Sequence, residues 1–375
     1  MKSIIIYTLA LMALTSCSKN EEATTPDNPT PQTPQTPREI RISAAIEASA
    51  QSKAVTRADV TPLTGPIDGT ADIAGIQFLR KDDVASKSSL SFEGVTAITG
   101  TRTKNDNNNS TTTDGDITFD GTPKPQYDLV NNHHAYFAAY YPAGTVDTDT
   151  KTATFTIDGK TDILYAPLFD AGCYAAAGSV TSSTMTFSHA LAQLEVVCKA
   201  ESGVSIDVIK EVWGKIKKIE IATKEKASYA YSNQEFTFST DENGGTGTKK
   251  LPLLGNDYKT TFAADGIDIP TYDNSTVNAA GMFAPAAESN TDAITLTITT
   301  QVNSGSAVTT EVAVQLKDGS NNSKGFERGL KHTATLTFKS TTKEIKVTGT
   351  TITPWGTGYT GTGDVTPNSS TPPTT

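Results

Sequence analysis

Segments in which apolar and polar residues alternate, with Thr as the commonest polar residue, recur along the chain and limit the folds that it can adopt. The clearest are residues 293–299, Ala-Ile-Thr-Leu-Thr-Ile-Thr, and residues 333–338; residues 218–221 and 344–347 are shorter examples. A period of two places apolar side chains on one face of a β-strand and polar side chains on the other. Antiparallel sheets with one solvated face have this pattern.

Turn-forming stretches rich in Asn, Asp and Gly separate the alternating segments, at residues 105–115, 241–247 and 318–324. Past the first residues of the chain, a helical pattern with caps is confined to residues 206–213. Short strands divided by polar turns predict an all-β protein built from β-sandwiches.

The first 17 residues have the layout of an export signal. Lys2 gives a positive start, an apolar run follows from Ile4 to Leu14, and small residues precede Cys17. As a helix, this run would span roughly 16 Å, about half of the hydrocarbon core of a bilayer, which makes it a poor permanent anchor. Leu-Thr-Ser-Cys resembles the lipobox of bacterial lipoproteins, which implies a diacylglyceryl thioether on Cys17 and cleavage before it. An ordinary secretory signal that contains a cysteine is the alternative.

A polar tether follows the signal. Residues 18–37 consist mostly of Pro, Thr, Gln, Asn and Glu and contain no large apolar side chain. Such a segment cannot bury enough apolar surface to offset the entropy lost on ordering, so we expect an extended tether between a membrane and the folded part of the chain.

The tether leads into one alternating strand and then a linker. Residues 39–48 place Ile40, Ile42 and Ile46 on one face at a period of two, and small and polar residues follow as far as Arg57. An exposed linker that contains an arginine is a good site for a protease. The simpler interpretation is the first strand of a sandwich followed by a loop.

Charge and length restrict the functional classes further. The 375 residues carry 31 Lys and Arg against 41 Asp and Glu, a net charge of −10, and no basic patch with interleaved aromatics is present. Because phosphate contacts require such a patch, nucleic acid is not an expected partner. More than 300 residues remain after the tether, enough for two domains with cores of their own.

Catalytic and metal-binding patterns are missing from the sequence. His133 and His134 are adjacent, so on a strand they would face opposite sides, and His189 is expected to be a structural residue. Neither His-Glu-x-x-His, Cys-x-x-Cys nor Gly-x-Ser-x-Gly occurs, and residues 114–116 (Asp-Gly-Asp) do not meet the calcium-loop pattern and are expected in a surface loop. We therefore predict no enzyme activity, catalytic residue, metal or cofactor. A pocket with converging carboxylates or a histidine pair would favour a hydrolase instead.

Two cysteines remain beside Cys17. Cys173 and Cys198 could form a disulfide in an oxidising compartment, but two thiols in a long chain also occur free and buried. The sequence leaves both states open.

Several short motifs follow one another along nearly the whole chain. They lie at residues 14–17, 39–48, 55–58, 135–142, 187–194, 326–332 and 352–356. The aromatic strand Ala-Tyr-Phe-Ala-Ala-Tyr-Tyr-Pro at 135–142 and Ile-Thr-Pro-Trp-Gly at 352–356 are examples. Together they resemble the fimbrillin family of Bacteroidetes, the subunits of type V pili.

The resemblance implies two transthyretin-like β-sandwich domains in tandem and an outer-membrane lipoprotein at the cell surface. It also implies a cut by an Arg-specific surface protease, by position after Arg57, which makes Ala58 the new N-terminus. The strand with Ile40, Ile42 and Ile46 would then be a removable latch. Its groove would accept a strand from another fimbrial subunit by β-strand addition.

The predicted organisation has five segments. They are the lipoprotein signal 1–17, the tether and removable strand 18–57, a first sandwich 58–183, a second sandwich 184–358 and a flexible tail 359–375. The Gly, Ser and Thr residues of 178–183 suit a joint between the sandwiches.

The place of the chain in a pilus stays open at this point. The C-terminal tail contains many Gly and Thr residues, which a long apolar donor strand should lack, so a tip or accessory subunit is compatible with the sequence. The alternative function is a surface lipoprotein that binds glycans or a host or bacterial surface protein. Trp213, Tyr229 and Tyr231 would stack on sugars if they were exposed.

Overall fold

The computed structural model describes the folded part of the chain. The described residues are 36–46, 65–67, 71–84, 90–104, 114–130, 133–174, 184–241, 244–258, 260–262, 265–286, 291–317 and 323–354. The predictions on Cys17, Arg57 and Ala58, and those on most of the tether and on the tail, lie outside these ranges. Residues Pro37–Thr375 cluster as one compact unit.

Strands dominate the described residues, and the helical pattern at residues 206–213 forms the one helix among them, α1 (Ile206–Trp213). The predicted all-β class is therefore confirmed. Helix α1 starts at Ser205, whose hydroxyl accepts a hydrogen bond from Asp207 N, and ends at Gly214 with a φ of 67°. A Cβ on Gly214 would also lie 1.9 Å from Gln301 O, so only glycine fits there. None of the described segments forms a helix with the length and apolar character needed to cross a membrane.

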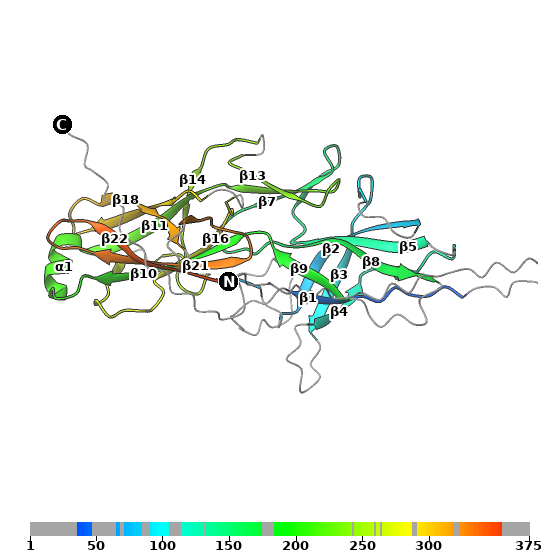
Figure 1. The fold of residues 1–375 in the computed structure, drawn as a ribbon, viewed down its shortest axis with the longest axis horizontal. Helices are drawn as coiled ribbons and strands as arrows, with labels where there is room; N and C mark the ends of the chain where they lie inside the picture. Colours follow the sequence, from blue (N-terminus) through cyan, green and yellow to red (C-terminus); the bar gives the residue numbers. More distant parts are fainter. Residues whose placement is uncertain are drawn as a thin grey trace, which may run out of the picture. The chain divides into compact units, whose positions relative to one another are not determined.

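A closed barrel contains most of the N-terminal strands (Figure 1). In ring order its strands are β1 (Ser43–Ile46), β4 (Asp114–Phe119), β3 (Ile98–Lys104), β2 (Ile73–Val84), β5 (His133–Tyr141), β8 (Leu164–Cys173) and β9 (Thr184–His189). Strand β1 pairs antiparallel with β4 and parallel with β9, so the first strand of the chain closes the ring. Rings of Phe78, Phe119 and Phe137 pack inside it, with centroids 5.1–6.5 Å apart.

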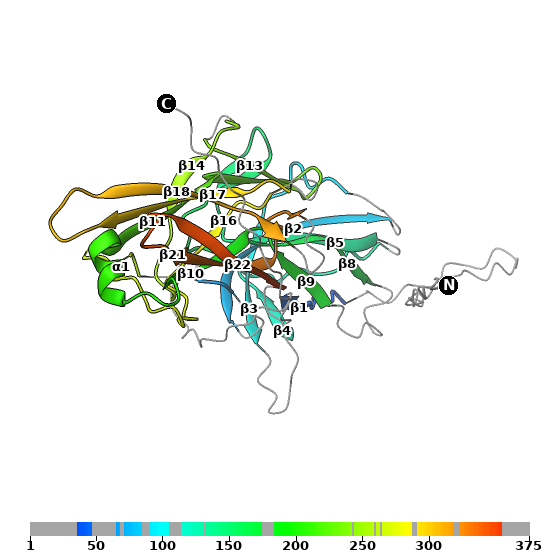
Figure 2. The same ribbon diagram turned by 60° about the vertical axis from the view of Figure 1, so that its left-hand side comes forward.

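Two further sheets enclose a second core (Figure 2). One has the order β16 (Ala279–Phe283), β10 (Ala192–Ala200), β21 (Leu330–Phe338) and β22 (Ile345–Pro354). The other has β14 (Lys249–Pro252), β11 (Lys215–Thr223), β17 (Ile294–Gln301) and β18 (Val308–Val314), with β15 (Ile267–Asp268) beside β11. The alternating segments at 293–299 and 333–338 become β17 and β21, as their pattern predicts.

A smaller sheet joins segments from the two halves of the chain. Its order is β13 (Phe236–Ser239), β12 (Lys226–Ala230), β7 (Thr152–Thr156) and β6 (Thr145–Asp147); β19 (Leu316–Lys317) and β20 (Ser323–Lys324) form a separate pair. A third core lies between this sheet and β5, and it contains Tyr140, whose hydroxyl is 2.6 Å from that of Tyr231.

The sheets do not separate at residue 183. Strand β9 follows the predicted joint but completes the barrel, while β7 precedes it and pairs with β12. The division into sandwiches at 58–183 and 184–358 stays a prediction. The expectation of a surface loop at Asp114 and Gly115 is wrong, because both residues belong to β4, where they pair with β1.

Candidate functional site

The N-terminal strand lies in a groove of the barrel between β4 and β9. Backbone hydrogen bonds hold the segment that leads into β1. They are Tyr127 N to Arg38 O at 2.9 Å, Ile40 N to Pro125 O at 2.9 Å and Ile117 N to Ile42 O at 3.0 Å. The segment is therefore paired on its way into the groove as well as inside it.

Inside the groove, β1 forms a ladder on both sides. Against β4 its Ala44 lies opposite Gly115, and against β9 its Ile46 lies beside Phe187. The parallel ladder with β9 covers residues 184–187, whereas the ladder between β8 and β9 covers only residues 188–189. Removal of β1 would leave backbone groups of β4 and β9 without their ladder partner, which is costly in a buried position.

The side chains predicted as the latch all point into the barrel core. Ile40, Ile42 and Ile46 are 1%, 3% and 1% exposed, and they join the apolar cluster that fills the barrel. Each buried isoleucine contributes roughly 1.5–3 kcal/mol relative to exposure. Arg41, between two of them, is exposed, as the predicted alternation requires at that position, whereas Ser43 is buried.

A buried arginine that no sequence pattern predicts lies against the N-terminal strand. Arg102 of β3 is fully buried; its Nε donates to Ala44 O at 3.1 Å and its Nη1 to Ala71 O at 2.5 Å. The signal in the sequence is its phase, because Arg102 lies at a period of two from Ile98 and Gly100 and so shares their face of the strand. Charged side chains are seldom fully buried, so phase alone would not have identified it.

A second anchor holds the chain beyond the predicted cleavage linker. Asp162 is fully buried and its Oδ2 accepts hydrogen bonds from Ile67 N and from His189 Nδ1, both at 2.9 Å. Gly65 N also donates to Lys160 O at 2.7 Å. Residues 65–67 are thus fixed by hydrogen bonds that do not involve β1, although Ile67 packs in the same apolar core as the latch isoleucines. His189 holds one end of β9 to this anchor.

The remaining histidines do not converge on a shared ligand. His133 Nδ1 lies 2.9 Å from Asp128 Oδ2, while His134 Nδ1 lies 2.8 Å from Asp170 Oδ2. Across the described residues, no group of three or more His, Cys, Asp or Glu side chains is placed to hold a metal ion. Cys173 and Cys198 are both buried and free, which settles the choice between thiols and a disulfide.

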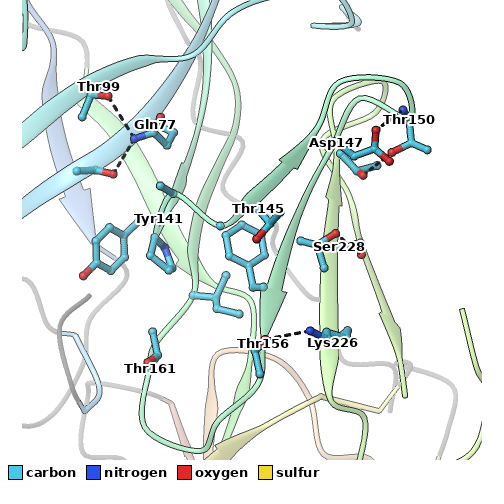
Figure 3. Close-up of a pocket in the computed structure, with 18 of the residues that line it drawn as sticks. Gln77, Thr99, Tyr141, Thr145, Asp147, Thr150, Thr156, Thr161, Lys226 and Ser228 are labelled. Carbon is cyan, nitrogen blue, oxygen red and sulfur yellow. Dashed lines mark hydrogen bonds between the residues drawn. The ribbon is translucent and has the colours of Figure 1, made fainter. Parts of the chain in front are cut away.

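A cavity of about 960 Å³ lies between the outer face of the small sheet and strands β2 and β3 (Figure 3). Hydroxyl groups line much of it, including those of Thr154 and Ser228, which are 3.3 Å apart. Gln77 Nε2 donates to Gly75 O at 3.1 Å, and Lys226 Nζ donates to Thr156 Oγ1 at 3.1 Å. Apolar residues such as Phe155 and Ile163, and the charged residues Asp147 and Lys226, line it as well.

The aromatic residues considered for sugar stacking are all buried. Trp213 packs on Phe338 and donates its Nε1 hydrogen to Lys339 O at 2.9 Å. Tyr229 and Tyr231 belong to the third core. None of the three presents a ring face to a ligand, so the reason for expecting a stacking surface at these residues is wrong.

Comparison with known proteins identifies the family. Residues 86–355 match the family model described as fimbrillin-like. The chain belongs to this fimbrillin-like family. The match covers more than half of the sequence and confirms the resemblance seen in its motifs, and it begins after the N-terminal strand. Among curated proteins, none gives a significant match.

Solved structures similar to this fimbrillin-like chain come from species of Bacteroides and Parabacteroides. A candidate cell adhesion protein from Bacteroides uniformis ATCC 8492 shares 16% identity over 84% of this chain and 98% of its own, with a TM-score of 0.48. A fimbrial protein from Bacteroides vulgatus ATCC 8482 shares 16% identity over 76% and 93%, with a TM-score of 0.42. A fimbrial assembly protein from Parabacteroides distasonis ATCC 8503 shares 9% identity over 85% and 97%, with a TM-score of 0.40.

Proposed function

We propose that this fimbrillin-like chain is a structural subunit of a cell-surface fimbria, assembled by strand exchange after proteolysis. It is exported by its N-terminal signal and anchored in the outer membrane by lipid on Cys17, and its role is not enzymatic. The observation that carries the proposal is the position of β1, which closes the barrel between β4 and β9. It is joined to the rest of the fold through the linker that contains Arg57.

The two anchors explain how one cut would open the groove. The latch strand is held by β4, β9 and residues 125–127, whereas the chain after the linker is held separately at residues 65–67. A cut after Arg57 leaves Ala58 as the new N-terminus of a chain that keeps this second anchor. The latch strand, once separate, can leave, and the strand of another subunit can restore both ladders and the apolar core.

The finer description of the fold belongs to the same proposal. In it, the barrel and the pair of sheets around the second core correspond to two tandem transthyretin-like domains, with the third core as their shared boundary. The subunit acts in the stalk, at the tip or as an accessory protein in adhesion. Before the cut, the lipid on Cys17 holds the precursor at the outer membrane with the groove closed.

Polymerisation of purified precursor tests the proposal. Treatment with an Arg-specific protease should convert monomers into fibres, detected by light scattering and electron microscopy. Arg57→Lys is the matched control, because it keeps the charge but resists the protease, and it should stay monomeric. Monomers that are cut at Arg57 yet keep their N-terminal strand would show that assembly by this switch is wrong.

The alternative function, binding of glycans or of a surface protein, now depends on the cavity beside the small sheet rather than on aromatic stacking. Its hydroxyl groups and the amide of Gln77 could hydrogen-bond to a sugar. A glycan array would favour this alternative if specific binding were lost in Gln77→Ala and kept in a variant of an exposed residue outside the cavity, such as Val308→Ala.

A further inference from the structure

The groove contains a buried cation, and burial of apolar side chains does not account for it. Arg102 hydrogen-bonds to Ala44 O, a carbonyl of the N-terminal strand itself, and to Ala71 O. A charge inside a protein core is stable only when acceptors surround it. The strand in the groove therefore supplies one of the acceptors on which the buried guanidinium depends.

Gly115 provides the space for this side chain. A Cβ on Gly115 would lie 3.0 Å from Arg102 Cζ, 3.1 Å from Arg102 Cγ and 2.6 Å from Thr103 O. The guanidinium thus occupies the volume that a side chain at position 115 would fill. Ala44 is paired directly opposite Gly115, and both residues are buried on the inner face of the barrel.

A larger side chain at position 44 would enter the same volume. Cβ atoms of directly opposite residues lie about 4.5–5.5 Å apart, so a leucine at position 44 would reach the space beside Gly115. The groove consequently accepts large side chains where Ile42 and Ile46 lie and a small one between them.

This arrangement sets the register of the strand. A shift by one residue turns the isoleucines outward, so the apolar pattern alone excludes it. A shift by two residues keeps every side chain on the same face, and the pattern alone permits it. Such a shift would place Ile42 or Ile46 opposite Gly115, against the guanidinium of Arg102.

We propose that Arg102 and Gly115 form a register gate, which admits a strand only with a small side chain opposite Gly115 and large apolar side chains two residues to either side. Residues 42–46, Ile-Ser-Ala-Ala-Ile, meet this rule. The role of the gate in exchange rests on the proposed function. The gate adds to that function a definition of the strand that a partner subunit must donate. It restricts the donor to the order large, any, small, any, large.

The first test uses the intact chain and urea unfolding. Ala44→Leu should lower the folding equilibrium constant about 30-fold through overpacking. The matched control Ala45→Leu, one residue along on the outer face, should change it less than about 3-fold. In an Arg102→Met background, the loss caused by Ala44→Leu should shrink at least fivefold. Equal losses for Ala44→Leu and Ala45→Leu, or an unchanged loss in that background, would overturn the gate.

The second test uses the wild-type chain after cleavage at Arg57 and needs no variant to fold. Fluorescent peptides of residues 36–48 compete for the groove in three versions, native, Ala44→Leu and Ala45→Leu. The gate predicts that Ala45→Leu binds as the native peptide does, while Ala44→Leu loses about 10-fold or more in affinity. Equal affinities refute the gate and leave strand exchange intact. If no peptide enters, exchange itself fails, and the unfolding cycle alone decides whether the gate positions the chain's own strand.

Discussion

Truncation of one latch side chain should weaken the hold of the groove on β1 by a predictable amount. Ile42 is 3% exposed and lies in the barrel core between β4 and β9. Ile42→Ala removes three carbons at about 0.8 kcal/mol each and leaves a cavity, so we expect a loss of about 2.5–4 kcal/mol. The matched control is Arg41→Ala, which changes an exposed residue of the segment that leads into β1 and should cost less than about 0.5 kcal/mol.

Two assays separate local release of β1 from global unfolding. Urea unfolding measures the total loss of stability, and hydrogen exchange read by mass spectrometry measures opening of residues 38–46. A loss of 2.5–4 kcal/mol that is local to β1 would raise its opening equilibrium by about 60- to 700-fold, since 1.4 kcal/mol is a factor of ten. If Ile42→Ala and Arg41→Ala exchange at the same rate and unfold at the same urea concentration, β1 does not hold the barrel closed.

Three further predictions concern buried polar groups. Burial lowers the pKa of His332 to about 4, so between pH 6.5 and 4 the unfolded chain binds a proton that the folded chain does not. The free energy of unfolding should therefore fall by up to about 1.4 kcal/mol per pH unit as the pH drops through this range. In urea titrations, His332→Gln should flatten that slope. Asp162→Ala should cost about 2–5 kcal/mol, because Ile67 N and His189 Nδ1 lose their acceptor, and a double variant with His189→Ala should cost less than the sum. Burial raises the pKa of the Cys198 thiol to about 12, so mass spectrometry should find it unlabelled by iodoacetamide at pH 8 until urea unfolds the chain.

The sequence predicts the strands well where apolar and polar residues alternate. Strands β17 and β21 follow the alternation of residues 293–299 and 333–338, because their apolar side chains enter the second core while several of the threonines between them stay partly exposed. Strand β5 lacks such alternation, since residues 135–141 are buried on both faces between the first and third cores. Its aromatic residues and the family resemblance predict this strand, whereas periodicity does not.

Pairing between distant segments was beyond the sequence. The parallel ladder between β1 and β9 joins residues 43–46 to 184–187, and no local pattern encodes such a contact. The same holds for Arg102, because its acceptors Ala44 and Ala71 become neighbours only when the barrel closes. Asp-Gly-Asp at residues 114–116 is typical of turns, whereas tertiary packing requires a glycine within a strand at position 115.

N-terminal sequencing of subunits within fimbriae sheared from the cell surface tests the central claim most directly. The account predicts that these subunits begin at Ala58 and lack the latch strand with Ile40, Ile42 and Ile46. Assembled subunits that still carry residues 18–57, with lipid on Cys17, would contradict it.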